Sequence, residues 1–85
     1  MNISVLSPDR EIFRGVIQSV KVPGVTGQFE ILAHHAPLVS ALGDGNVRIR
    51  KSDGTDMSFR IKKGFIEVLY NKISLLVQGA EELQG

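Results

Sequence analysis

The sequence PGVTGQFEILAHHAPLVSALGDGNVRI, residues 23–49, decides the fold of this chain. Gly24 and Gly27 lie at the two ends of a tight turn, because glycine adopts positive φ angles without steric cost. The run that follows, residues 28–32, is short and rich in branched and aromatic side chains, as strands are. The opening of the stretch therefore predicts a hairpin with a protruding, backbone-rich tip.

The second half of the stretch predicts two more strands. Pro37 removes a backbone donor and disfavours helical angles at Ala36, so residues 35–42 are expected to form a loop that enters a strand. Val47 and Ile49 then alternate with polar residues, which is the period of a strand with one buried face. Antiparallel strands joined by glycine turns are the expected organisation here.

The rest of the chain continues in the same way. Asp53-Gly54 is a strong hairpin signal, because both residues tolerate positive φ. Other turn signals separate apolar runs of about five to eight residues, and they lie at Ser7-Pro8-Asp9, Lys63-Gly64, Asn71-Lys72 and Gly79. This pattern predicts a single all-β domain over residues 1–85, built as two sheets packed face to face, with a barrel as the alternative.

Side-chain alternation assigns faces to several strands. In residues 16–22 the two expected faces are Val16, Gln18, Val20 and Val22 against Ile17, Ser19 and Lys21. Met57, Phe59 and Ile61 are expected on a dry face, with the polar residues between them on a wet face.

Composition excludes several classes of function. The chain has 85 residues, a net charge of +1 and no cysteine, so it forms no disulfide and no thiolate metal site. The charge balance gives no general attraction to nucleic acid or anionic lipid. No apolar run approaches the roughly 18–20 residues that span a bilayer, so any membrane contact is expected to come through a partner.

No arrangement of residues predicts catalysis. His34 and His35 are adjacent on an extended segment and point to opposite sides, and no carboxylate cluster completes a metal site around them. The turn from Gly24 to Gly27 is followed by a strand rather than the helix that a phosphate loop requires. No catalytic, cofactor-binding or metal-binding residue is expected.

A basic cluster forms the main alternative. Arg48, Arg50, Arg60 and Lys62 come from two runs that pair across Asp53-Gly54, and they are expected to share one sheet face. That face would suit single-stranded nucleic acid, although it lacks aromatic side chains for base stacking. A small β-barrel that carries a ligand is a third hypothesis.

Residues 23–49 closely resemble the hallmark segment of the ε subunit family of F-type ATP synthases. The family pattern is a Gly-x-x-Gly turn, an apolar strand, His-Ala-Pro-Leu, and a glycine followed by an Arg-Ile strand. The matching residues are Gly24, Gly27, Ile31, Leu32, His35, Ala36, Pro37, Leu38, Gly45, Arg48 and Ile49. The resemblance implies a ten-stranded β-sandwich in a non-catalytic subunit of a proton- or sodium-translocating complex.

The resemblance also implies two partners. The family domain sits in the central stalk and couples the γ subunit to the membrane c-ring. The residues that match the γ-facing segment are Ser7, His35, Ala36, Pro37, Leu38 and Ser40, and Ser7 lies on the same side as the others in relatives. The residues that match the c-ring tip are Gly24, Val25, Thr26, Gly27 and Gln28. Gln28 stands where many relatives carry a carboxylate.

The end of the chain departs from the typical bacterial pattern. Bacterial members continue into a helical hairpin, whereas this sequence stops at Gly85, where the sandwich would finish. No C-terminal helical hairpin and no inhibition by it are therefore expected of this polypeptide. The implied location is the cytoplasmic face of the bacterial plasma membrane or the stromal face of a plastid thylakoid, and the isolated chain is expected to be monomeric.

Overall fold

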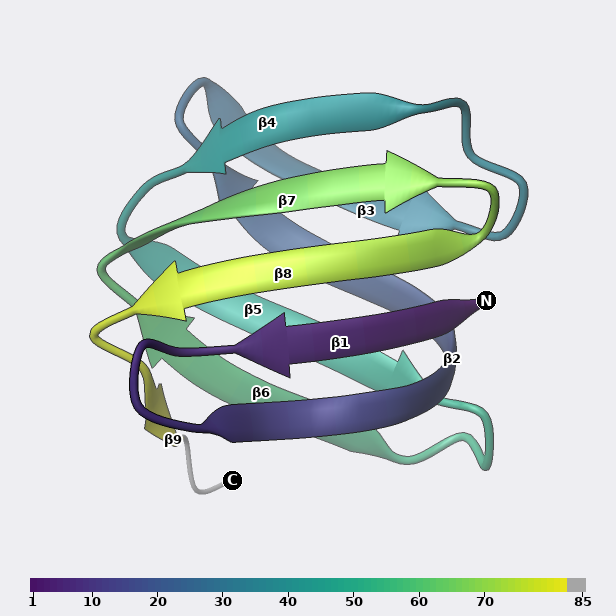
Figure 1. Cartoon of the computed structure of the whole chain (residues 1–85), viewed down its shortest axis with the longest axis horizontal. Coiled ribbons are helices and arrows are strands. Elements are labelled where there is room, and N and C mark those ends of the chain that lie inside the picture. The colour runs from purple at the N-terminus through teal and green to yellow at the C-terminus, as the bar shows by residue number, and fades with distance from the viewer. Residues whose placement is uncertain (83–85) are drawn as a thin grey trace.

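The computed structural model describes residues 1–82, and these residues form strands joined by turns (Figure 1). This part of the chain contains nine strands and no helix, so it holds no helix that could cross a membrane. The strands are β1 (Asn2–Leu6), β2 (Glu11–Gly24), β3 (Gly27–Leu32), β4 (Leu38–Leu42), β5 (Gly45–Lys51), β6 (Asp56–Ile61), β7 (Lys63–Leu69), β8 (Lys72–Gln78) and β9 (Glu81–Glu82).

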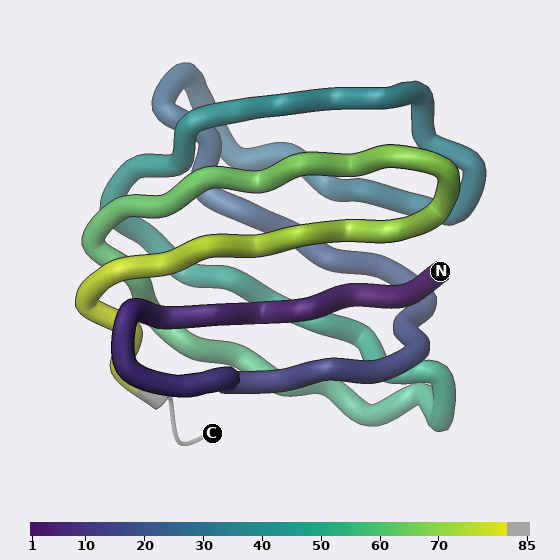
Figure 2. Tube along the Cα trace, viewed as in Figure 1, coloured from purple at the N-terminus to yellow at the C-terminus, as the bar shows by residue number. Residues whose placement is uncertain are grey.

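The strands form two layers that share β2. In the front layer of Figure 1, here called sheet I, β4, β7, β8 and β1 lie side by side, and the first half of β2 pairs with β1. In the rear layer, sheet II, the second half of β2 pairs with β3 and β5, and β6 and β9 follow. The predicted all-β sandwich is confirmed. The count of ten strands is not, because β2 runs unbroken through both layers (Figure 2).

A bulge in β2 lets the strand change layers. Its pairing with β5 shifts register between Ile17 and Ser19, and Ile17 and Val20 are both buried while Gln18 is exposed. A bulge inserts one residue and reverses the alternation beyond it. The predicted faces are therefore correct for Val20 and Val22 and wrong for the residues before the bulge.

The core fills the space between the layers with branched aliphatic side chains and one phenylalanine. Burying such a side chain stabilises the fold by about 1.5–3 kcal/mol. No polar or charged side chain of residues 1–81 is buried. The buried residues are Ile3, Val5, Ile17, Val20, Val22, Ile31, Leu42, Val47, Ile49, Phe59, Ile61, Ile66, Val68, Ile73, Leu75 and Val77.

Two of the predicted turns can be compared with the structure directly. Asp53-Gly54 lies between β5 and β6 as expected, with Gly54 at φ 88° and Asp53 Oδ1 accepting a 2.9 Å hydrogen bond from the Thr55 N–H. The turn between β7 and β8 falls one residue earlier than predicted. Tyr70 and Asn71 form it at φ 49° and 61°, because Leu69 pairs with Lys72.

Candidate docking surfaces

The outer face of sheet I is apolar. Of the exposed large hydrophobic side chains, most come from its strands: Leu6, Val16, Val39, Phe65, Leu69 and Leu76. Strand register places four residues in one row across the sheet, in the order Ala41, Phe65, Leu76 and Leu6. An exposed apolar patch with polar surroundings is typical of a surface that another protein covers.

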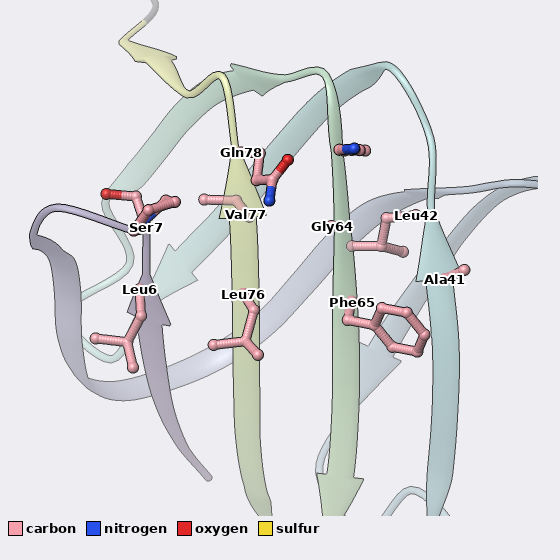
Figure 3. Close-up of a pocket in the computed structure, with 11 residues that line it drawn as sticks. Leu6, Ser7, Ala41, Leu42, Gly64, Phe65, Leu76, Val77 and Gln78 are labelled. Atoms are coloured by element: carbon pink, nitrogen blue, oxygen red, sulfur yellow. The ribbon is translucent and has the colours of Figure 1, made fainter.

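The apolar row borders a hollow of about 620 Å³ at the end of sheet I (Figure 3). Its lining combines the row with Ser7 and Pro8 after β1, and with Lys63 and Gln78 at the strand ends. Gly64 lies in this hollow, and a Cβ atom there would stand 2.5 Å from the carbonyl oxygen of Leu76. The close approach of β7 and β8 therefore requires glycine at this position.

The outer face of sheet II is charged rather than apolar. Asp56 lies between Arg48 and Arg50, at 3.3 Å and 3.0 Å, and Asp44 lies 2.9 Å from Arg60. The hydrogen bond from Arg50 lowers the pKa of Asp56, and Asp56 in turn raises the pKa of Arg50.

Ion pairing weakens the nucleic-acid hypothesis. Arg48 and Arg50 of β5 and Arg60 of β6 each form an ion pair with a carboxylate. A nucleic-acid phosphate would have to displace that carboxylate in order to bind. Lys62 lies outside β6, in its connection to β7, and not on the strand where it was expected. Three of the four predicted cations on this face thus take part in surface ion pairs, with Arg48 and Arg50 sharing the one carboxylate of Asp56.

The glycine turn forms a two-residue hairpin tip between β2 and β3. Gly24 pairs with Gly27, and a Cβ atom on Gly24 would lie 2.6 Å from the carbonyl oxygen of Gly27. Gly27 has a φ angle of 140°, which residues with a side chain rarely adopt, so glycine is favoured at this position. Between them Val25 and Thr26 are exposed, and Gln28 follows as an exposed residue at the start of β3.

The tip is fastened to the end of β4. The Gly43 N–H donates a 2.9 Å hydrogen bond to the carbonyl of Pro23, and the Val25 N–H donates a 3.4 Å bond to the carbonyl of Ala41. The tip and the hollow therefore lie at the same end of sheet I, since Ala41 lines that hollow.

The His-Ala-Pro-Leu segment lies at the opposite end of β4. His35, Ala36 and Pro37 are exposed, and His35 Nδ1 lies 2.7 Å from the carbonyl oxygen of Ala36. Leu38 is half-buried and packs against the core, so only part of its side chain is open to a partner.

Alternation along β4 explains the position of Leu38. Leu38 and Ser40 pair with the buried Val68 and Ile66, whereas Val39 pairs with the exposed Glu67. The outward residues of β4 are thus Val39 and Ala41. Neither residue is in the predicted γ-facing set, although the period of two in this run identifies both once Leu38 is assigned to the core.

Ser7 is not beside His35. Leu6 ends β1 at the level of Ala41, near the end of β4, while His35 precedes the start of β4. The structure thus separates two residues that the family resemblance placed on one side, and it leaves the outer face of sheet I between them. Ser7 itself closes the turn after β1, where its Oγ donates to Asp9 Oδ1 at 2.8 Å.

The two histidines have separate surroundings. His34 is hydrogen-bonded to Asn71, whereas the His35 ring lies at hydrogen-bond distance from a carbonyl of its own loop. Among the described side chains, those of residues 1–81, no three His, Cys, Asp or Glu gather closely enough to hold a metal ion.

An apolar outer face on a small β-sandwich is typical of a domain that docks on another protein. The family model described as the β-sandwich domain of the ATP synthase delta/epsilon chain matches residues 1–83, so the chain belongs to that family. Membership confirms the predicted family and identifies the chain as a non-catalytic subunit.

Curated relatives agree with this assignment. The chain is 42% identical over 76 residues to an ATP synthase epsilon chain of Chlorobium limicola, covering 89% of this chain and 86% of the relative. It is 43% identical over 76 residues to the epsilon chain of Leptospira borgpetersenii, of which it spans 59%. It is 43% identical over 82 residues to the chloroplastic epsilon chain of Emiliania huxleyi, of which it spans 62%.

Solved structures agree with the fold. A chain of the Euglena gracilis mitochondrial ATP synthase superposes with a TM-score of 0.85 at 18% identity, over 94% of this chain and 51% of that one. A chain of the Tetrahymena thermophila central stalk and c-ring structure gives a TM-score of 0.81 at 17% identity, over 96% of this chain and 66% of that one.

Proposed function

We propose that this chain is a central-stalk, or rotor, subunit that couples the γ subunit of an F-type ATP synthase to the membrane c-ring. The observation that carries the proposal is the apolar outer face of sheet I on a member of this family. A sandwich with a close-packed core also suits torque transmission, because such interiors have low compressibility.

The γ contact is assigned to the outer face of sheet I. Ser7 and the segment from His35 to Pro37 lie at its two ends, and Phe65 and Leu76 lie between them. A partner that spans this face would cover both ends. Leu38 and Ser40 are the remaining members of the predicted γ-facing set. They lie on the inner side of β4, so they would support the γ contact by holding β4 in place.

The c-ring contact is assigned to the glycine tip, Gly24, Val25, Thr26, Gly27 and Gln28. Its exposed backbone permits close approach by a loop of the ring, because glycine adds no side chain. Gln28 provides a neutral amide, so a hydrogen bond would stand where many relatives could form a salt bridge. The tip and the γ face adjoin at Ala41, so one rigid domain could hold both partners.

The proposed location follows from the proposed partners. The chain would sit at the cytoplasmic face of the bacterial plasma membrane, as a peripheral part of the complex. The stromal face of a plastid thylakoid is the alternative, because the relatives include both bacterial and chloroplastic epsilon chains.

Calorimetric titration of the chain with purified γ subunit tests the proposal. Leu76→Glu places a charge on the apolar face and is expected to weaken binding at least tenfold, as loss of a central apolar contact does. Leu32→Glu is the matched control, because Leu32 is similarly exposed, at 55% against 52%, but lies on sheet II. Absence of binding between the unaltered chain and γ at micromolar concentration would overturn the proposal.

A further inference from the structure

A second, smaller hollow lies on the same outer face of sheet I, and it is called the polar hollow here because polar side chains surround it. It measures about 320 Å³ and lies over β1, β8 and the first half of β2. Its polar lining consists of Asn2, Ser4, Arg14, Lys72 and Ser74. Two hydroxyls and two cations in one hollow form a surface suited to a carboxylate, which accepts hydrogen bonds from both kinds of group.

Strand register fixes the arrangement of these groups. Ser4 of β1 pairs with Ser74 of β8 on one side and with Arg14 of β2 on the other. Asn2 pairs with Lys72 one step further along the sheet. The two serines therefore lie side by side, with one cation at the β2 edge and the other at the end of β8.

The charges of this region are only partly compensated. Arg14 forms an exposed ion pair with Glu11 at 2.8 Å, whereas Lys72 has no ion-pair partner among the side chains of residues 1–81. Glu67 of β7 pairs with Ser74 on the opposite side of β8 from Ser4, and it would repel a carboxylate there. Repulsion by Glu67 therefore favours a bound carboxylate on the side of β8 that pairs with β1, near Lys72 and Arg14.

The distance from the polar hollow to the apolar row is close to the rise of one turn of a helix. Ser4 and Ser74 each lie two residues before Leu6 and Leu76, which corresponds to about 6.6 Å along the strands. Successive turns of a helix rise about 5.4 Å, and side chains four residues apart lie about 6 Å from each other. One helix lying along β8 could therefore present an apolar side chain and an acidic side chain to the two hollows together.

We propose that the γ segment bound to sheet I is an amphipathic helix whose apolar side chain enters the hollow beside Phe65 and Leu76. An Asp or Glu one turn away binds between Ser4, Ser74 and Lys72. This inference rests on the proposed γ contact and adds the chemistry of the partner segment to it. The carboxylate sets the direction of the helix, because Glu67 closes the other side of β8 to it.

Titration with purified γ subunit at low and high salt tests the inference. Lys72→Glu is expected to weaken binding about tenfold at low salt, as reversal of an interfacial charge does, and the loss should shrink at high salt because screening shortens the range of the interaction. Lys72→Gln should weaken binding by a smaller factor. Lys21→Glu makes the same charge change on sheet II and should alter affinity less than about twofold.

The outcomes separate this inference from the proposed function. Equal affinities for the Lys72→Glu and Lys21→Glu variants, with γ bound normally by the unaltered chain, would overturn the carboxylate assignment and leave the γ contact standing. Failure of the unaltered chain to bind γ would overturn both. Circular dichroism melting of each variant verifies that the sandwich stays folded, both for the exposed Lys72 and for the half-buried Lys21.

Discussion

The backbone N–H of His34 donates a 2.7 Å hydrogen bond to Oδ1 of Asn71, thirty-seven residues further along the chain. The side chains of these two residues also meet, with Asn71 Nδ2 at 3.3 Å from His34 Nδ1. Both residues have positive φ angles, 65° for His34 and 61° for Asn71. The β3–β4 loop, which carries His35, Ala36 and Pro37, is thus fastened to the turn between β7 and β8.

Asn71→Ala is expected to destabilise the fold by about 1–3 kcal/mol, because it removes an acceptor from His34 and places alanine in a left-handed conformation. Asn71→Gly loses the same hydrogen bond but accepts the positive φ, so its loss should be smaller. Urea unfolding followed by circular dichroism measures both. Equal destabilisation by the two variants would contradict a conformational contribution at Asn71.

Gly64→Ala should destabilise the sandwich by about 1–3 kcal/mol, because the new Cβ would overlap the carbonyl oxygen of Leu76 and force β7 and β8 apart. Gly43→Ala is the matched control. Its Cβ would meet only the Cγ1 atom of Val25, at an ordinary 3.9 Å, so a change below about 0.5 kcal/mol is expected. Thermal unfolding of both variants decides whether close strand approach explains the glycine.

Acid should weaken the fold through two exposed aspartates. Hydrogen bonding from Arg50 lowers the pKa of Asp56, and hydrogen bonds from the side chain and backbone N–H of Thr55 lower the pKa of Asp53. A carboxyl with a lowered pKa in the folded state stabilises it fully above the unfolded pKa, about 3.9, and this stabilisation is lost as the pH falls through the folded value.

Asp56→Asn tests this pH dependence. The variant should be less stable than the unaltered chain near neutral pH, and the difference between their urea midpoints should narrow below about pH 4. Added salt should also narrow the difference near neutral pH, because the ion pairs with Arg48 and Arg50 are exposed. A difference that stays constant from neutral pH into acid would contradict the assigned role of the charge.

The sequence predicts the strands well and their faces less well. The glycine turn and Asp53-Gly54 are local signals, and the structure has turns at both places. The predicted assignment of Val16 and Gln18 to the same face as Val20 is wrong. The bulge in β2 that separates them depends on pairing with β5, which is a long-range contact. The shifted turn at Tyr70 has the same cause, since register between β7 and β8 selects it.

The candidate surfaces were predictable only where they are continuous in sequence. The glycine tip is one segment, and the sequence identified it. The apolar face of sheet I is assembled from Leu6, Val39, Phe65 and Leu76, which lie on four strands far apart in the chain. Only the strand order brings them together, and no single stretch of sequence contains that order.

Leu38 and Val39 test which side of β4 meets the partner. Leu38→Asn places an amide against the core and should destabilise the fold by about 1–3 kcal/mol. Val39→Asn introduces the same side chain at a position that is 62% exposed, and it should lower stability by less than about 1 kcal/mol.

Binding to γ should show the opposite order. Val39→Asn removes an apolar contact from the proposed interface and is expected to weaken binding about threefold to tenfold, whereas folded Leu38→Asn should keep nearly the affinity of the unaltered chain. Urea unfolding gives the stabilities, and calorimetric titration under conditions where both variants are folded gives the affinities. Stronger loss of γ affinity in Leu38→Asn than in Val39→Asn would mean that the inner side of β4 becomes exposed on binding, which would refute docking on the intact outer face of sheet I.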